Sequence, residues 1–213
     1  MRSPWLDIPL ADYEGHMALP GVGQAEMLAT QFAQLLATWT PASAAVIGCA
    51  GGNGFDRVRV QITRRLVGID INPQYIQELA YRYAGRIPGL ELYVRDIQEP
   101  LGAIMPVQLI YAALVMEYVE PVAALRSFAS LCGPDAILAT VLQLPDPSPQ
   151  VSESPFTRLK DLAPAMHLVA PEQLAGMASE QGFSLLATRQ LSLSSGRQFA
   201  LQLYRHGVTN ARR

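Results

Sequence analysis

A turn of small residues follows an apolar segment at residues 44–48 and leaves room for a ligand against the main chain. Residues with little or no side chain let the backbone turn sharply and approach a ligand closely. We expect the free N–H groups of a helix after this turn to face that ligand. Asp70 ends the next apolar segment, 18 residues after Gly52, near the roughly 20-residue spacing at which a carboxylate on the second strand reaches a ribose hydroxyl. Together these features predict an adenosyl-cofactor site.

Three other chemistries fit this turn less well. Lys160 is the only lysine of the chain, so the turn cannot be a phosphate loop of the kind that ends in Gly-Lys. The GxGxxG pattern cannot be laid on the turn without losing a required glycine, which leaves an NAD(P)-dependent oxidoreductase as the weaker alternative. The GxSxG elbow of α/β-hydrolases does not occur in the sequence.

Composition predicts one compact domain without a nucleic-acid partner. Half of the 213 residues are hydrophobic, 16% are charged, and the net charge is −2, unlike the basic surface that binds phosphate backbones. Cys49, Cys132 and the three histidines have no metal-ligand spacing, so we expect neither a metal nor a disulfide. The longest apolar run, residues 109–116, is too short to span a bilayer, and no signal-peptide pattern is present. We therefore expect a cytoplasmic protein with no membrane partner, and the sequence does not indicate its oligomeric state.

Apolar periodicity and turn residues predict alternating strands and helices. The expected strands are residues 44–48, 66–70, 90–94, 107–113 and 136–142. The expected helices are residues 27–39, 54–63, 73–84, 121–131 and 171–181. Asn72 precedes Pro73, a capping side chain followed by proline at the first helical position. This alternation predicts a doubly wound, mostly parallel α/β sheet with helices on both faces.

The C-terminal part departs from this rhythm. Two further apolar runs, residues 183–193 and 198–204, flank Ser194-Ser195-Gly196, which predicts a hairpin and hence one antiparallel strand. Residues 145–170 begin with a stretch rich in proline and polar residues, suited to a loop that covers the substrate at the strand ends. We expect residues 1–213 to form a single domain, with a lid or helical segment at residues 1–43 and the core at residues 44–205.

The chain resembles the class I S-adenosylmethionine-dependent methyltransferases over roughly residues 44–205. Four motifs carry the resemblance: Gly48-Cys49-Ala50-Gly51-Gly52, Val67-Gly68-Ile69-Asp70-Ile71-Asn72, Val94-Arg95-Asp96-Ile97, and the segment from Leu109 to Val119. The family implies a Rossmann-like sheet of seven strands whose last strand is antiparallel, in agreement with the predicted hairpin. Val46 and Ala50 depart from the pattern, since the family usually has an acidic residue and a glycine at these positions.

The resemblance implies S-adenosyl-L-methionine as the cofactor, with S-adenosyl-L-homocysteine as the product. Asp70 is then expected to accept hydrogen bonds from both ribose hydroxyls, Asp96 to accept from the adenine amino group, and Ile71 and Ile97 to lie against the adenine ring. The remaining implied contacts are those of the glycine-rich turn and of the segment after the fourth strand, namely Gly48, Cys49, Ala50, Gly52, Ala112, Ala113 and Leu114. A tight turn or ordinary core packing is the alternative interpretation for these small residues.

The sequence identifies the acceptor side only by position. Candidate residues near the strand ends or the lid are Tyr13, His16, Tyr111, Glu117, Tyr118 and Gln143. The segment Tyr13-Glu14-Gly15-His16-Met17 either folds over the cofactor as a lid or forms a polar terminus without fixed structure. The expected acceptor is a small molecule or a protein, and the accepting atom is not indicated.

The implied chemistry needs little acid–base machinery. The positive sulfur activates its own methyl group, so the protein has to align a nucleophile within about 3 Å and exclude water. This reaction is consistent with the lack of a catalytic dyad or triad in the sequence. The alternative from a different class is a methyltransferase-like protein that binds the cofactor or a partner without turnover.

Overall fold

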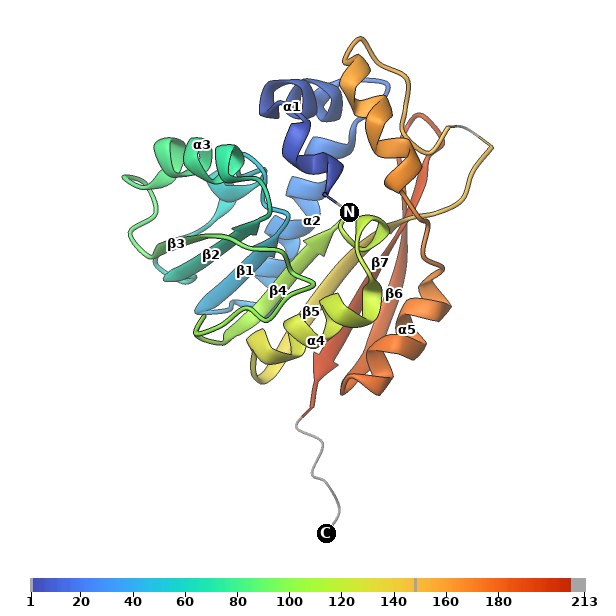
Figure 1. Cartoon of the computed structure of the whole chain (residues 1–213). Coiled ribbons are helices and arrows are strands. Elements are labelled where there is room, and N and C mark those ends of the chain that lie inside the picture. Colours follow the sequence, from blue (N-terminus) through green and yellow to red (C-terminus); the bar gives the residue numbers. More distant parts are fainter. Residues whose placement is uncertain (1, 148, 208–213) are drawn as a thin grey trace.

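A mixed sheet forms the centre of the computed structural model, which describes residues 2–147 and 149–207 (Figure 1). Its strands lie in the order β3-β2-β1-β4-β5-β7-β6. They are β1 Ser43–Ile47, β2 Arg65–Asp70, β3 Leu90–Val94, β4 Val107–Ala113, β5 Cys132–Gln143, β6 Phe183–Ser192 and β7 Gln198–His206. Neighbouring strands are parallel except that β7 runs antiparallel to β5 and β6. The predicted fold class, with one antiparallel strand near the C-terminus, is confirmed.

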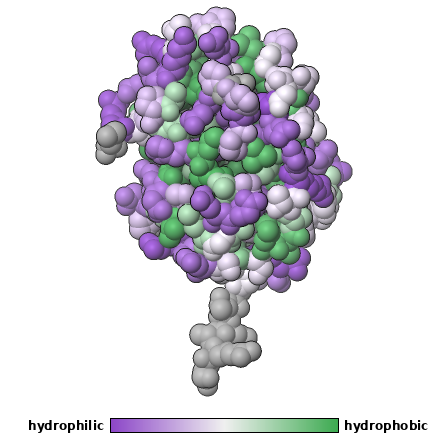
Figure 2. Space-filling model, turned by 90° about the vertical axis from the view of Figure 1, so that its right-hand side faces the viewer, coloured by the Kyte–Doolittle hydropathy of each residue, from purple (hydrophilic) through white to green (hydrophobic). Residues whose placement is uncertain are grey.

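The predicted C-terminal hairpin is formed by β6 and β7. Ser192 pairs with Gln198, and the connecting turn holds Gly196 at φ 87°. β6 is one of the two edge strands of the sheet, and its Leu185 and Leu186 are 46% and 44% exposed. Figure 2 views the side of the molecule on which β6 and α5 lie and shows apolar surface gathered among polar side chains.

Helices cover both faces of the sheet. The longer ones are α2 Gln24–Trp39, α3 Pro73–Tyr83, α4 Pro121–Leu131 and α5 Pro171–Glu180. Because successive strand residues point to opposite faces, Ala44 and Val46 of β1 pack in the core beneath α2 and α3. Ala45 and Ile47 pack in the other core, beneath α4 and α5. The centre of the sheet is therefore buried on both sides, as the unbroken apolar strands predict.

The expected helix over residues 54–63 is wrong. The structure has only the three-residue 3₁₀ helix η2, Phe55–Arg57, followed by irregular backbone and turns. The reason lies in the spacing of Val58, Val60 and Ile62, which are β-branched and alternate with polar residues. That spacing does not place them on one stripe of a helix. Consequently no long helix after β1 directs its N–H groups at a ligand.

Two segments far apart in the sequence lie above the carboxyl ends of the strands (Figure 1). One is N-terminal, with the 3₁₀ helix η1 Pro4–Asp7 and the helix α1 Leu10–Ala18; the other contains the 3₁₀ helix η4 Thr157–Ala165. Ile8, Leu159 and Leu162 form a small core between them. The N-terminal segment is therefore ordered by contacts with the η4 region, and the part of residues 145–170 that the structure describes lies at the strand ends.

None of the helices formed by residues 2–147 and 149–207 is long and apolar enough to cross a membrane. In the same described residues no group of three or more His, Cys, Asp or Glu side chains is placed to hold a metal ion.

Candidate functional site

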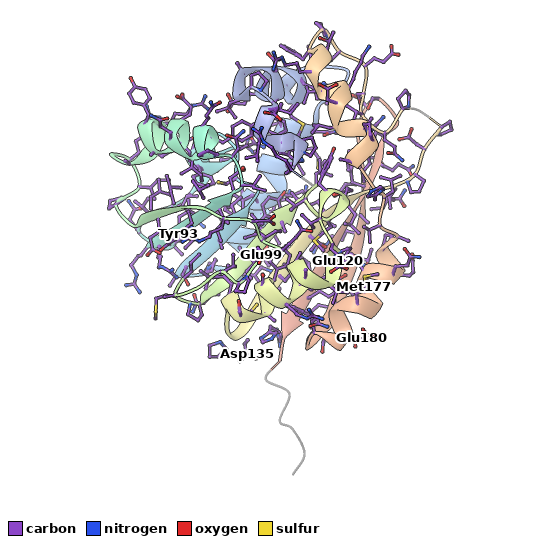
Figure 3. All side chains as sticks on the ribbon, in the orientation of Figure 1. Tyr93, Glu99, Glu120, Asp135, Met177 and Glu180 are labelled. Atoms are coloured by element: carbon purple, nitrogen blue, oxygen red, sulfur yellow. The ribbon has the colours of Figure 1, made fainter. Side chains whose placement is uncertain are left out.

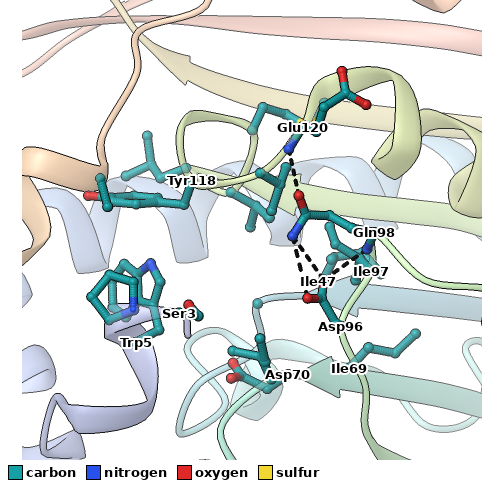
Figure 4. A pocket seen from close by; sticks show the side chains of 18 of the residues that line it. Ser3, Trp5, Ile47, Ile69, Asp70, Asp96, Ile97, Gln98, Tyr118 and Glu120 are labelled. Carbon is teal, nitrogen blue, oxygen red and sulfur yellow. Dashed lines mark hydrogen bonds between the residues drawn. The ribbon is translucent and has the colours of Figure 1, made fainter. Parts of the chain in front are cut away.

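A cavity of about 950 Å³ opens at the carboxyl ends of the strands. The chain winds from β1 outward through β2 to β3, then returns to β4 on the other side of β1. Ligands of doubly wound sheets bind where the winding reverses in this way. Figure 4 shows Trp5 and Tyr118 on one side of the cavity and Asp96 and Gln98 on the other, with Asp70 below them. The cavity is within the size range of small-molecule sites.

The turn after β1 is tied to the end of β2. The Gly48 N–H donates to the Ile69 carbonyl oxygen at 2.8 Å, and the Ala50 N–H donates to Asp70 Oδ2 at 2.9 Å. Gly48 has φ 63° and Ala50 has φ 45°, the left-handed conformation that a residue with a side chain rarely adopts. Both residues line the cavity. The main chain therefore borders the cavity closely even though alanine stands at the third position of the turn.

Gly52 supports the turn from behind the cavity wall. Its φ is 90°, and a β-carbon here would meet the Leu79 side chain and, at 2.9 Å, the Tyr83 ring. We predict that Gly52→Ala lowers the free energy of unfolding by about 2 kcal/mol, because it adds both backbone strain and overpacking. Urea denaturation measures the loss. Gly85→Ala is the matched control, since a β-carbon at Gly85 has no neighbour within 4 Å; equal stability of the two variants would contradict this role.

Asp70 lies at the base of the cavity with its carboxylate held by main-chain groups. Its Oδ2 accepts from the Ala50 N–H and its Oδ1 accepts from the Asn72 N–H, both at 2.9 Å. Burial raises the pKa of Asp70, and these hydrogen bonds oppose the rise. Each carboxylate oxygen retains a further lone-pair site. The cap of α3 is Asn72, whose side chain accepts from the Gln74 N–H, so Asp70 has no capping duty, as the sequence predicts.

Asp96 and Ile97 form the opposite wall. Asp96 Oδ1 accepts from the main-chain N–H of Gln98 at 2.9 Å and from its Nε2 at 3.2 Å. Gln98 Oε1 in turn accepts from the Glu120 N–H at 2.8 Å, which ties this loop to the residue that caps α4 (Figure 3). Ile97 is 6% exposed, and it lines the cavity together with Ile71. One wall thus combines an acceptor group with aliphatic side chains.

An aromatic layer forms the wall on the N-terminal side. Trp5, Tyr13, Tyr75 and Tyr118 all line the cavity. The Trp5 ring stands nearly perpendicular to the rings of Tyr13 and Tyr118, and Tyr13 stacks on Tyr75. The sequence singles out Tyr13 and Tyr118 but not Trp5 or Tyr75, because only the folded chain brings η1 and α3 to this place.

Solved structures identify the fold. No family model matches the sequence, and no curated protein matches it. N-methyltransferase NodS from Bradyrhizobium japonicum WM9, in complex with S-adenosyl-L-homocysteine, is 18% identical to this chain with a TM-score of 0.66. The match covers 91% of this chain and 95% of the NodS chain. Magnesium protoporphyrin IX methyltransferase (ChlM) from Synechocystis PCC 6803 is 14% identical with a TM-score of 0.61, at coverages of 87% and 84%. The chain has the class I methyltransferase fold.

Proteins with this methyltransferase fold differ in what they do. The [4+2]-cyclase SpnF is 15% identical to this chain with a TM-score of 0.64, and the match covers 84% of this chain and 81% of SpnF. A likeness at this level of identity extends to the fold and not to the reaction. The reaction is therefore inferred from the side chains around the cavity.

Within the methyltransferase fold, most of the residues implied by the resemblance reach the cavity. Those that line it are Gly48, Ala50, Asp70, Ile71, Asp96, Ile97, Ala113 and Leu114. Cys49, Gly52 and Ala112 do not: Cys49 and Ala112 are buried in the two cores. The strand alternation explains Ala112, since its side chain points into the core beneath α4 and α5.

Four predicted acceptor-side residues, His16, Tyr111, Glu117 and Gln143, also lie outside the cavity wall. Tyr111 points into the core under α2, where its hydroxyl donates to the Leu28 carbonyl oxygen at 3.0 Å. His16 is buried, and the pKa of its imidazole is lowered by burial and then by the charge of Arg197. His16 is a buried residue of α1 itself and is not among the residues that line the cavity.

Glu117 and Gln143 connect the wall to the loop after β5. The Gln143 N–H donates to Glu117 Oε1 at 2.7 Å, and Gln143 Nε2 donates to the Gln150 carbonyl oxygen. Arg197 donates to the same carbonyl oxygen. Glu117 is completely buried, and burial raises its pKa to about 7. Because its neighbours Met116 and Tyr118 line the cavity, this network supports the wall without being part of it.

The N-terminal segment is fastened to α3 and to the turn. Asn72 Nδ2 donates to the Trp5 carbonyl oxygen at 2.9 Å, and the Tyr75 hydroxyl donates to the Ile8 carbonyl oxygen at 2.8 Å. Arg82 forms a two-point ion pair with Glu14 and donates to the Gly51 carbonyl oxygen. The N-terminal segment is therefore attached to α3 and to the turn after β1, beside the cavity; its role as a lid stays a prediction.

Proposed function

We propose that this protein is an S-adenosylmethionine-dependent methyltransferase that acts on a small-molecule or protein acceptor by direct in-line methyl transfer. The observation that carries the proposal is the Asp70 carboxylate, which ends β2 at the base of the cavity beside the turn after β1. The fold supports the same conclusion, since solved neighbours contain S-adenosylhomocysteine or S-adenosylmethionine. The cytoplasmic location stays a prediction from the sequence.

The cavity residues fit the parts of this cofactor. Asp70 has free lone-pair sites on both oxygens for ribose hydroxyls. Asp96 offers an acceptor for the adenine amino group, and Ile71 and Ile97 offer aliphatic surface for the ring. The main chain at Gly48 and Ala50 borders the place left for the amino-acid part. Val46 is part of the core beneath α2, so the acidic residue usual two positions before the first glycine has no counterpart here.

The chain contributes binding, alignment and exclusion of water. When bound, the cofactor supplies an activated methyl group on a positive sulfur. Trp5 and Tyr118 line one side of the cavity (Figure 4), and the N-terminal segment that carries Trp5 is attached there through Asn72, Tyr75 and Arg82. Holding both reactants in a closed site accounts for catalysis without a general base.

The structure weakens the oxidoreductase alternative. In dinucleotide-binding sheets the pyrophosphate sits at the N-terminus of the helix that follows the first strand. Here η2, Phe55–Arg57, replaces that helix. A protein that binds the cofactor without turnover has the same cavity as an enzyme and is separated from one only by an activity assay.

Calorimetry and an assay with labelled cofactor test the proposal. We expect S-adenosylmethionine and S-adenosylhomocysteine to bind at one site per chain and NAD to give no binding heat. Incubation of the protein with methyl-labelled S-adenosylmethionine and a metabolite extract is expected to transfer label to an acceptor. Binding of NAD alone would overturn the proposal in favour of a dehydrogenase, and binding without label transfer to metabolites or proteins would identify an inert binder.

A further inference from the structure

Three aromatic rings from separate elements meet at the cavity wall. Trp5 belongs to η1, Tyr13 to α1, and Tyr118 to the 3₁₀ helix η3, Met116–Tyr118. The Trp5 centroid lies 5.6 Å from that of Tyr13 and 5.1 Å from that of Tyr118, with an interplanar angle of 83° in both pairs. These edge-to-face contacts join the three rings into one cluster at the cavity wall, called the aromatic box below.

The box is held in place from behind. All three rings pack against the small core of Ile8, Leu159 and Leu162. Tyr13 also stacks on Tyr75, with centroids 6.4 Å apart. Burial raises the pKa of the Tyr13 and Tyr118 hydroxyls, and nearby carboxylates add to the rise. Both phenols are therefore neutral at physiological pH.

The cavity wall carries more negative than positive side chains. The described residues that line it include four carboxylates, Asp70, Asp96, Glu120 and Asp161, and two guanidinium groups, Arg2 and Arg95. Arg2 is paired with Asp7 at 2.9 Å. Asp161 is exposed on η4, the element whose Leu159 and Leu162 pack against the aromatic box. A positively charged group is favoured here over a neutral or negative one.

We propose that the methyl acceptor is an amine, and that Trp5, Tyr13 and Tyr118 bind the positive charge that its nitrogen acquires. A cation over aromatic faces is attracted by the ring quadrupole, most strongly by tryptophan, and the attraction grows when water is excluded. Such a box recognises an alkylated ammonium group better than an uncharged group of the same shape. This inference rests on the proposed function and adds the chemical class of the acceptor to it.

The group-transfer step balances for an amine. The acceptor releases its ammonium proton to bulk water before it enters the site, so that it binds as the neutral amine. The lone pair of this neutral nitrogen forms the new N–C bond while the C–S bond breaks and its electron pair stays on sulfur. The positive charge moves from sulfur to nitrogen, inside the aromatic box, and a nitrogen that still carries hydrogen then releases a proton to water. One positive charge is present before the transfer, on sulfur, and one after it, on nitrogen, so the step creates no new pair of separated charges.

Binding of a cation and its neutral isostere tests the inference. The protein is first titrated with S-adenosylhomocysteine, and choline and 3,3-dimethyl-1-butanol are then titrated into the saturated complex. These probes have the same shape and differ in charge. We expect choline to bind about tenfold or more tightly than the alcohol. Tyr118→Leu and Trp5→Leu are expected to remove the preference, whereas Tyr118→Phe, which keeps the ring, retains it.

Tyr81→Leu provides the surface control, because Tyr81 is 87% exposed on α3. Circular dichroism and the affinity for S-adenosylhomocysteine show whether each variant is folded. Equal affinity of the wild type for the two probes, or a preference that survives in a folded Tyr118→Leu variant, would overturn the inference and leave the proposed function standing. Lack of S-adenosylhomocysteine binding in the wild type would overturn the proposed function and this inference with it.

Discussion

Asp70→Ala is expected to weaken the binding of S-adenosylhomocysteine by about 1.5–3 kcal/mol, the usual contribution of hydrogen bonds to a charged group. The reason is that the Asp70 carboxylate has acceptor sites left after it binds the Ala50 and Asn72 N–H groups. Loss of the side chain also loosens the turn that these groups hold. Isothermal titration calorimetry measures the change, and urea denaturation shows that the variant is folded at the temperature of the titration.

Two further variants separate the role of Asp70 from a general effect of charge. Asp70→Asn keeps the shape and one acceptor oxygen, so we expect an intermediate loss of affinity. Asp56→Ala removes an exposed carboxylate of η2 outside the cavity wall and is expected to leave the affinity unchanged. Unaltered binding by a folded Asp70→Ala variant would remove the basis of the site assignment.

The second large effect concerns Glu117 and pH. Its pKa is raised by burial from 4.5 to about 7 in the folded protein, so the folded state holds a proton that the unfolded state releases. The contribution of Glu117 protonation to the free energy of unfolding is fully present below about pH 4.5 and is lost as the pH rises through about 7. The difference corresponds to roughly 3 kcal/mol. We therefore expect Glu117→Gln to be more stable than the wild type at pH 8, by up to this amount, and close to it at pH 5.

The substitution preserves the contact that matters for the fold. Glutamine keeps an oxygen to accept from the Gln143 N–H and carries no charge at any pH, while Glu117 Oε2 has no hydrogen-bond partner within the described residues. Urea denaturation at pH 5 and pH 8 measures the effect. The control is Glu180→Gln, at the end of α5 away from the cavity (Figure 3), which is expected to follow the wild type. Identical pH profiles for Glu117→Gln and the wild type would show that the buried carboxyl does not govern this dependence.

Local signals predict most of the sheet. Apolar runs bounded by turn residues locate β1 to β4 within one residue at each end. For β1, β2 and β4 the reason is that strands buried on both faces need few polar positions. Asn72 and Pro73 mark the start of α3, and Ser194-Ser195-Gly196 marks the hairpin. These features depend on residues adjacent in the sequence, so they can be predicted without a structure.

Two segments were not predictable in this way. The helix expected after β1 is replaced by η2, because alternating β-branched residues do not form a helical stripe. The helix α1 was not expected, and it is held by contacts that no local pattern reveals. Its Gly15 is one example: a β-carbon there would overlap the Phe156 ring, so the glycine allows the close approach of the 145–170 region.

The candidate site also has one part that local sequence predicts and one part that only the folded chain brings together. The spacing between the turn and Asp70 predicts the cofactor side, since both parts follow strands that must be neighbours. The proposed acceptor side consists of Trp5 of η1, Tyr118 of η3 and Asp161 of η4, which line the cavity from elements distant in the sequence. Tyr111 and Glu117 show the limit of position alone, because a residue at a strand end points either into the cavity or into the core.

A crystal structure of the protein with S-adenosylhomocysteine tests the central claim most directly. We predict that the ribose hydroxyls lie within hydrogen-bond distance of the Asp70 carboxylate, with the adenine between Ile71 and Ile97 and the sulfur facing the side of the cavity formed by Trp5 and Tyr118. Nucleoside density at another place, or none in the cavity at saturating concentration, would contradict it.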